Sequence, residues 1–169
     1  MAKLTGILID SLAFAREQRS LAGKAAPGEL SRLQEMLADE SGSLEWRASG
    51  GRDAEGKLYL AIEVEGELHL TCQRCLGELS YALDVSSRLL LVPAGAPWPD
   101  EMLEDDSADA IPAMAEQPLL ELIEDEVLLA LPVAPRHASC QPPVSGADDG
   151  DGKDTPLRNL AKLRQQGSN

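Results

Sequence analysis

The sequence predicts one α+β domain: an antiparallel β-sheet meander with helices from the N- and C-terminal parts of the chain packed on it. Residues 43–92 alternate apolar and polar side chains, with glycines between the runs, as half-buried antiparallel strands do. Segments with helical spacing lie on both sides of this region. The chain has 169 residues, of which 43% are hydrophobic, so it can bury one ordinary core.

The N-terminal part is expected to contribute two helices. Residues 10–18, DSLAFAREQ, have the composition of a short helix with Asp10 or Ser11 as its N-cap. Residues 27–38, PGELSRLQEMLA, repeat apolar side chains at helical spacing after a proline, which favours a second helix. A looser conformation over residues 30–37 is the alternative.

The central strands are marked by a period of two. In GKLYLAIEVEG, residues 56–66, Leu58 and Ile62 share one face, while Tyr59 and Glu63 share the other. The runs ELHLTC, ELSYALDVSS and RLLLV extend the alternation as far as residue 92. Short glycine-containing joins between such runs are typical of an antiparallel meander.

The C-terminal helix has the clearest signal. Residues 118–132, PLLELIEDEVLLALP, begin and end with proline, which is tolerated in a first turn and ends a helix. The apolar stripe of this helix is formed by Leu119, Leu122, Ile123, Val127 and Ala130. Glu124, Asp125 and Glu126 point in three directions, so we expect a solvated face rather than a metal or acid–base cluster.

The sequence also indicates where the domain ends. Residues 1–140 are expected to form the α+β domain, with a mobile acidic segment near residues 94–115 that is rich in proline and alanine. Residues 141–169 have the composition of a linker, followed by a tail that could form another short helix.

The charge balance limits the classes of partner. The chain has 29 acidic and 15 basic residues, a net charge of −14, and 3% aromatic residues. Such a chain binds naked RNA poorly, because phosphate contacts need Lys or Arg and base stacking needs aromatic rings. We expect no signal peptide at the N-terminus, and no apolar run approaches the roughly 20 residues that span a bilayer. With only three cysteines, a disulfide framework is disfavoured, so we expect a cytoplasmic protein that binds no membrane.

Two of the cysteines, Cys72 and Cys75, lie two residues apart in LTCQRCLGEL, residues 70–79. A redox pair of this type opens a helix, whose N-terminus lowers the thiol pKa. Strand patterns flank this pair on both sides, so redox catalysis is disfavoured. No Gly-rich phosphate loop or Ser/His/Asp arrangement occurs elsewhere, and we therefore expect no enzyme.

A metal site is the alternative for the cysteine pair. A Cys-x-x-Cys turn followed by glycine resembles a zinc knuckle, and a closed structural zinc site has four ligands. His137 and Cys140 would supply the other two ligands, and His69 is a substitute for one of them. The plainer interpretation, which the sequence favours, is that Cys72 and Cys75 are small apolar side chains that shape a hairpin tip.

Three segments in order carry a resemblance to a known family. They are LTCQRCLGEL, LIEDEVLLALPVAPRHASC and a tail ending in LAKLRQ, and together they resemble the YceD family, named for large ribosomal RNA subunit accumulation. The resemblance implies a cytoplasmic bacterial protein needed for 23S rRNA accumulation or processing and for large-subunit assembly, without a known catalytic centre. In some relatives further cysteines follow the Leu-Pro, where this chain has only His137 and Cys140.

The charge pattern favours a protein partner. Ribosomal proteins are basic, so an acidic surface could hold a ribosomal or assembly protein by charge complementarity. The expected acidic surface comprises Asp100, Glu101, Glu104, Asp105, Asp106 and Asp109, although a solubilising loop would have the same composition. The alternative is contact with the 23S rRNA precursor through the hairpin tip and the basic tail, at Arg74, Arg158, Lys162 and Arg164. A ribonuclease or redox enzyme is the third class, and no residues support a ribonuclease.

Overall fold

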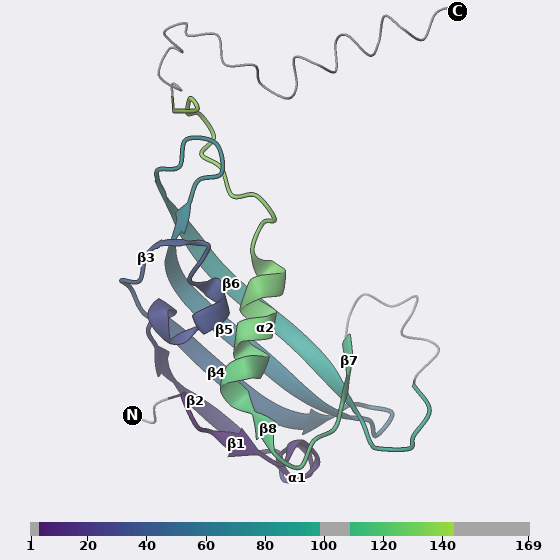
Figure 1. Cartoon of the computed structure of the whole chain (residues 1–169). Helices are drawn as coiled ribbons and strands as arrows, with labels where there is room; N and C mark the ends of the chain where they lie inside the picture. The colour runs from purple at the N-terminus through teal and green to yellow at the C-terminus, as the bar shows by residue number, and fades with distance from the viewer. Residues whose placement is uncertain (1–3, 99–108, 144–169) are drawn as a thin grey trace, which may run out of the picture.

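The computed structural model describes residues 4–98 and 109–143. Over these residues a long curved sheet has helices and turns on one face, which confirms the predicted α+β class (Figure 1). The helices are α1 (Ser11–Arg16) and α2 (Leu119–Ala130). The strands are β1 (Leu8–Ile9), β2 (Ser20–Ala25), β3 (Leu37–Asp39), β4 (Leu44–Arg52), β5 (Leu58–Thr71), β6 (Glu78–Val92), β7 (Asp109–Pro112) and β8 (Gln117–Pro118).

The predicted meander is present as β4, β5 and β6. Within the described ranges the main sheet has six strands in the order β2-β4-β5-β6-β7, and β3 pairs with β5. All pairs are antiparallel except β6 with β7, which is parallel. The long β5–β6 pairing, from Tyr59↔Leu90 to Thr71↔Glu78, extends the hairpin tip well beyond the body of the molecule (Figure 1).

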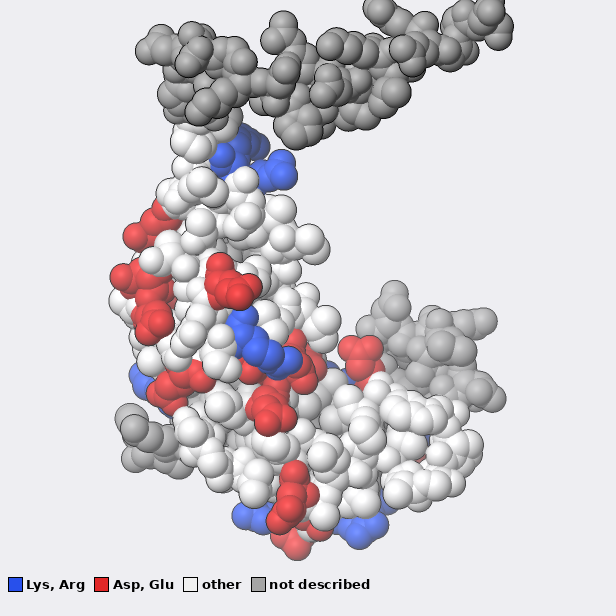
Figure 2. All heavy atoms as spheres, in the orientation of Figure 1, with Lys and Arg blue, Asp and Glu red and all other residues white. Residues whose placement is uncertain are grey.

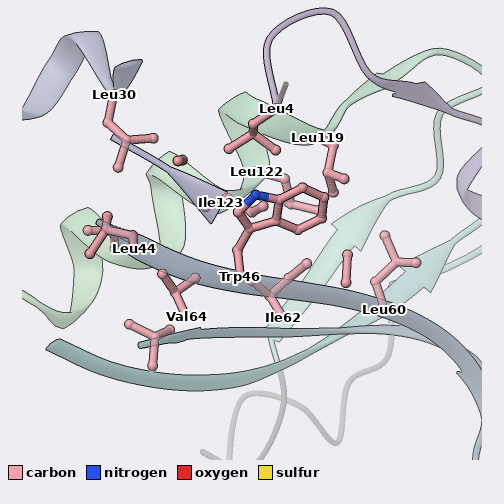
Figure 3. Packing of buried hydrophobic residues seen from close by; sticks show 14 of the residues in the cluster. Leu4, Leu30, Leu44, Trp46, Leu60, Ile62, Val64, Leu119, Leu122 and Ile123 are labelled. Carbon is pink, nitrogen blue, oxygen red and sulfur yellow. The ribbon is translucent and has the colours of Figure 1, made fainter. Parts of the chain in front are cut away.

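The core lies between the sheet and α2. Trp46, Val64 and Val85 lie in one cross-strand row and are all buried. Figure 3 shows Trp46 beneath Leu119 of α2, with the other buried side chains around it. Because strand side chains alternate between faces, the neighbouring positions of β4, β5 and β6 form an outer face that carries exposed carboxylates such as Glu65 and Asp84.

Helix α1 follows its sequence signals. The carboxylate of Asp10 accepts a hydrogen bond from the Ala13 N–H at 2.9 Å, which confirms one of the two predicted N-caps. Phe14 and Ala15 are completely buried. The helix backbone lies so close to β4 that a Cβ on Gly50 would be 2.5 Å from the Phe14 carbonyl oxygen, so glycine permits this packing.

The second predicted N-terminal helix is wrong. Residues 27–38 form two 3-10 turns, Pro27–Glu29 and Ser31–Leu33, and then enter β3. The Arg32 N–H donates to the Glu124 carboxylate at 2.7 Å, where a helix would use a backbone carbonyl. Leu37 pairs with Leu70 of β5. Most N–H groups of this segment donate to the carbonyl three residues earlier, as the Leu33 N–H does to Leu30, and the contacts with Glu124 and β5 are the tertiary ones. Residues 30–37 therefore follow the looser alternative.

Strands β2 and β7, like the shorter β1, β3 and β8, were not predicted from the sequence. Strand β2 occupies a Gly/Ala-rich segment and pairs with β4, placing Gly23 over the Trp46 ring. A Cβ on Gly23 would be 2.8 Å from that ring, so the lack of a side chain is required by packing. Strand β7 lies inside the long connection that follows β6 and pairs along Leu89–Val92.

Helix α2 has the predicted extent, but two of its acidic side chains are buried where solvent exposure was predicted. Leu119, Leu122, Ile123 and Val127 are buried as expected, whereas Ala130 is exposed. The expectation of a fully solvated acidic face is wrong, because Glu124 and Glu126 are only 4% and 7% exposed. Glu124 is buried against Arg32, and Glu126 lies beside the sheet in a groove described below.

Candidate metal centre

The Cys72–Gly77 turn closes the β5–β6 hairpin. The Cys72 N–H donates to the Gly77 carbonyl at 2.8 Å, and the Leu76 N–H donates to the Cys72 carbonyl at 2.9 Å. Leu76 has a φ of 60°, a left-handed conformation that is unusual for a leucine. The Arg74 N–H lies 3.4 Å from Cys72 Sγ. The turn therefore directs backbone N–H groups at a cysteine sulfur, as the zinc-knuckle interpretation requires.

The segment after α2 reaches this turn. It leaves the helix at Pro132 and runs along the hairpin to its tip (Figure 1). The Gln73 N–H donates to the Pro135 carbonyl at 2.8 Å, and His137 Nε2 lies 2.8 Å from the Glu78 carbonyl oxygen. These contacts bring His137 and Cys140 against the cysteine pair, although about sixty residues separate the two halves in sequence.

Cys72, Cys75, His137 and Cys140 form one compact cluster. Their ligand atoms all lie within 4.8 Å of one another. Cys75 Sγ lies 3.3 Å from His137 Nδ1, and Cys72 Sγ lies 3.8 Å from Cys140 Sγ. Tetrahedral zinc with Zn–S of about 2.3 Å and Zn–N of about 2.0 Å places its ligand atoms roughly 3.5–3.8 Å apart. The cluster has suitable donors at suitable spacing and could hold a metal ion.

The hydrogen bond of His137 sets its tautomer. A carbonyl oxygen can only accept, so Nε2 carries the proton that is donated to Glu78. The lone pair is then on Nδ1, which faces Cys75 Sγ. Metal-bound histidines usually have their second nitrogen anchored in this way, so the imidazole is oriented for metal binding.

The thiols differ in acidity. The pKa of Cys72 is lowered to about 5, and the largest cause is the hydrogen bond from the Cys75 N–H. Burial alone would raise this pKa, but the N–H groups of Arg74 and His137 also lower it. Burial raises the pKa of Cys140, and the adjacent Cys72 and Cys75 raise it further. These hydrogen bonds favour the thiolate form of Cys72, and a cation in the cluster would favour ionisation of the other sulfurs.

The structure thus brings together the full predicted ligand set. The plainer interpretation covers Cys72, which is fully buried, but it does not account for the half-buried Cys75 or for the orientation of His137. His69 is not part of the cluster, because its Nδ1 lies 2.9 Å from a Glu78 carboxylate oxygen.

The other candidate residues have separate positions. Arg74, the predicted contact residue of the hairpin tip, is half-buried, and its Nη1 lies 3.4 Å from the Cys140 carbonyl oxygen. Asp109 is the first residue of β7. The remaining candidates lie outside the described residues, as does the predicted tail helix: Asp100, Glu101, Glu104, Asp105, Asp106, Arg158, Lys162 and Arg164.

Sequence reasoning missed two features near these sites. Arg32 bridges Glu124 and Asp125 of α2 by side-chain contacts, and no local signal connects residues so far apart. Arg136 is exposed beside the cysteine cluster and could have been found, because it directly precedes His137.

Comparisons with known proteins agree with these features. The family model described as "Large ribosomal RNA subunit accumulation protein YceD" matches residues 60–165, which contain the complete cysteine–histidine cluster. A curated relative of the same name from Haemophilus influenzae is 25% identical over 177 residues, covering 95% of this chain and 96% of the relative. No solved structure matches significantly. None of the helices in the described ranges is long and apolar enough to cross a membrane.

Proposed function

We propose, from the premise that this chain belongs to the YceD family of large ribosomal RNA subunit accumulation proteins, that it is a non-catalytic factor in large-subunit assembly. It acts in the cytoplasm by binding a basic ribosomal or assembly protein, and this binding supports accumulation or processing of 23S rRNA. The name of the Haemophilus relative links that protein to the same RNA, which supports the general role in this chain.

The observation that carries the proposal is the excess of acid, 29 acidic against 15 basic residues. Figure 2 shows acidic side chains spread over the body of the molecule. On the outer face of the sheet, Glu65 is directly opposite both Glu45 and Asp84. Like charges directly opposite in a sheet are destabilising, so the chain keeps this excess of acid at a cost in stability. Negative charge spread over the whole molecule attracts a basic partner over long range.

Zinc in the cysteine–histidine cluster would have a structural role. The four side chains would complete a tetrahedral zinc site, leaving no open position for a reacting water or substrate. Such a site would hold the segment after α2 against the hairpin tip. This supports a binding role rather than hydrolysis.

A tagged pull-down from cells, repeated after RNase treatment, tests the protein-binding function. We expect basic ribosomal or assembly proteins to remain bound after RNase. Amide replacements at Asp100, Glu101, Glu104, Asp105, Asp106 and Asp109 together should weaken this capture at low salt. Loss of every bound protein with the RNA, or capture unchanged by the replacements at low salt, would contradict the acidic-surface mechanism.

Direct RNA contact through the hairpin tip is the second candidate function. Arg74 and Arg136 lie at the tip, and residues 72–77 and 132–143 contain no acid. Figure 2 shows basic side chains gathered at this end of the molecule. Leu76 is 64% exposed beside them. A local positive surface on an acidic chain favours a phosphate contact, to which the tail residues Arg158, Lys162 and Arg164 would add.

Arg136→Ala distinguishes this second function, because Arg136 is exposed and distant from the core. If the tip binds RNA, the variant should lower affinity for a 23S rRNA fragment several-fold in fluorescence anisotropy at low salt and reduce the salt dependence of binding. Arg47→Ala, an exposed arginine on the outer face, is the matched control. Equal affinities for both variants and the unmodified chain would exclude the tip as the RNA contact.

A further inference from the structure

Residues of α2, β6 and β7 line a groove, called here the α2–β7 groove. Figure 1 shows where these elements lie. The volume of the groove is about 540 Å³, within the usual range of ligand-binding clefts. Leu89 of β6 and Ile111 of β7 form one side, and Leu122 of α2 contributes to the other. Leu129, at the same groove, is 75% exposed, so a large apolar side chain is available at the surface.

The polar lining of the groove is entirely acidic. Asp109, Asp125 and Glu126 contribute carboxylates, and no Lys or Arg is among the described residues that line it. Asp125 is already paired with Arg32. Asp109 and Glu126 have no ion pair with any cation in the part of the chain that the structure describes. The groove therefore combines apolar walls with uncompensated negative charge.

Glu126 is the most informative of these residues. It is only 7% exposed, and a buried carboxylate without a cation is costly. Burial raises its pKa, and the charges of Asp109 and Asp125 raise it further, while the nearby Ser87 hydroxyl acts in the opposite direction. A cation from outside the described structure would stabilise the ionised carboxylate at this position.

We propose that the α2–β7 groove is the docking site for a basic amphipathic segment of the partner protein. An apolar side chain of that segment lies between Leu129 and Ile111, and a Lys or Arg pairs with Glu126 and Asp109. The inference rests on the proposed function, since it places the basic partner on one surface. Docking in this groove differs from general attraction to an acidic chain, because it requires the apolar walls of the groove together with the carboxylates of Glu126 and Asp109.

The test uses the immobilised full chain and large-subunit ribosomal proteins extracted free of RNA. Retained proteins are identified and quantified by mass spectrometry. The groove variant Glu126→Gln/Asp109→Asn should lower retention of the captured basic protein about tenfold, as expected for loss of a desolvated charge pair. Glu65→Gln/Asp84→Asn, on the outer face of the sheet, removes the same charge and should change retention less than twofold. Leu129→Ser tests how much the apolar wall contributes to retention. The Leu129 side chain is exposed, so this replacement leaves the core packing unchanged.

A photo-crosslinking residue placed at position 129 or at position 8 gives an independent measurement. Leu129 and Leu8 are both exposed, at 75% and 57%, but only Leu129 is at the groove. We expect the retained protein to crosslink from position 129 and not from position 8. Retention that both double variants reduce equally, or crosslinking from position 8 alone, would overturn the groove assignment and leave the protein-binding function intact. Failure of the unmodified chain to retain any basic protein would contradict the function itself.

Discussion

Cys75→Ser is expected to reduce zinc affinity by roughly 100-fold or more, and to lower the thermal stability of the full chain. A structural zinc site contributes about 10–16 kcal/mol in total, so each of its ligands accounts for roughly 3 kcal/mol. The lost sulfur is the one that faces His137 Nδ1 at 3.3 Å. Without metal, the segment after α2 keeps only its hydrogen bonds to the hairpin, such as Gln73 N–H to the Pro135 carbonyl.

Metal content after dialysis, measured by mass spectrometry, tests this prediction together with the melting temperature. The unmodified chain should retain about one zinc per molecule, as a closed four-ligand site implies, and a chelator should lower its melting temperature to that of Cys75→Ser. Gln73→Ala is the control, because Gln73 is exposed in the same turn but supplies no ligand. A metal-free unmodified chain whose stability resists both zinc and chelator would refute the zinc proposal.

Glu124→Ala is expected to cost about 2 kcal/mol of stability, mainly by leaving the Arg32 N–H without its acceptor. The Glu124 carboxylate accepts from that N–H at 2.7 Å and from Arg32 Nε at 2.9 Å. The Glu124 side chain is 4% exposed, so after its removal water reaches the Arg32 N–H poorly. Arg32 itself is about half exposed, and the charge–charge part of the pair therefore adds little.

Chemical denaturation of Glu124→Ala and Asp125→Asn measures this difference. Asp125 contacts the same arginine, but its side chain is 52% exposed, so its replacement should cost only a few tenths of a kcal/mol. A loss confined to Glu124→Ala supports a role for Glu124 in holding α2 against the 3-10 turns. Small and equal losses of stability in the two variants would show that the hydrogen bond from the Arg32 N–H to Glu124 is not needed to hold α2 in place.

Local signals were sufficient for the two helices and the three central strands of the fold. Alternation predicted β4, β5 and β6, a side-chain cap predicted α1, and two prolines bracketed α2. Residues 27–38 form 3-10 turns and β3 in place of the predicted helix, and contacts with Glu124 and with Leu70 of β5, far away in sequence, hold them there. Strand β2 was missed because Gly23, a poor strand former, is required beneath Trp46.

The candidate site was predictable to a similar degree. Two local spacings, Cys-x-x-Cys and His-x-x-Cys, indicated the four candidate ligands, although the sequence favoured a hairpin tip shaped by small apolar cysteines. The anchoring of His137 by the Glu78 carbonyl was not predictable, since it depends on the path of the chain after α2. The burial of Glu126 was predictable from helical spacing, because Glu126 follows Leu122 by four residues and Ile123 by three and so lies on the apolar face of α2.

The most direct test of the account is calorimetric titration of the purified full chain with the basic protein retained in the pull-down, in the absence of RNA. We expect saturable binding that weakens steeply between low and moderate salt, as charge complementarity requires, and that weakens further for Glu126→Gln/Asp109→Asn. Absence of binding between the two purified proteins, or binding of equal strength at every salt concentration, would contradict the central claim that this acidic chain acts by capturing a basic partner.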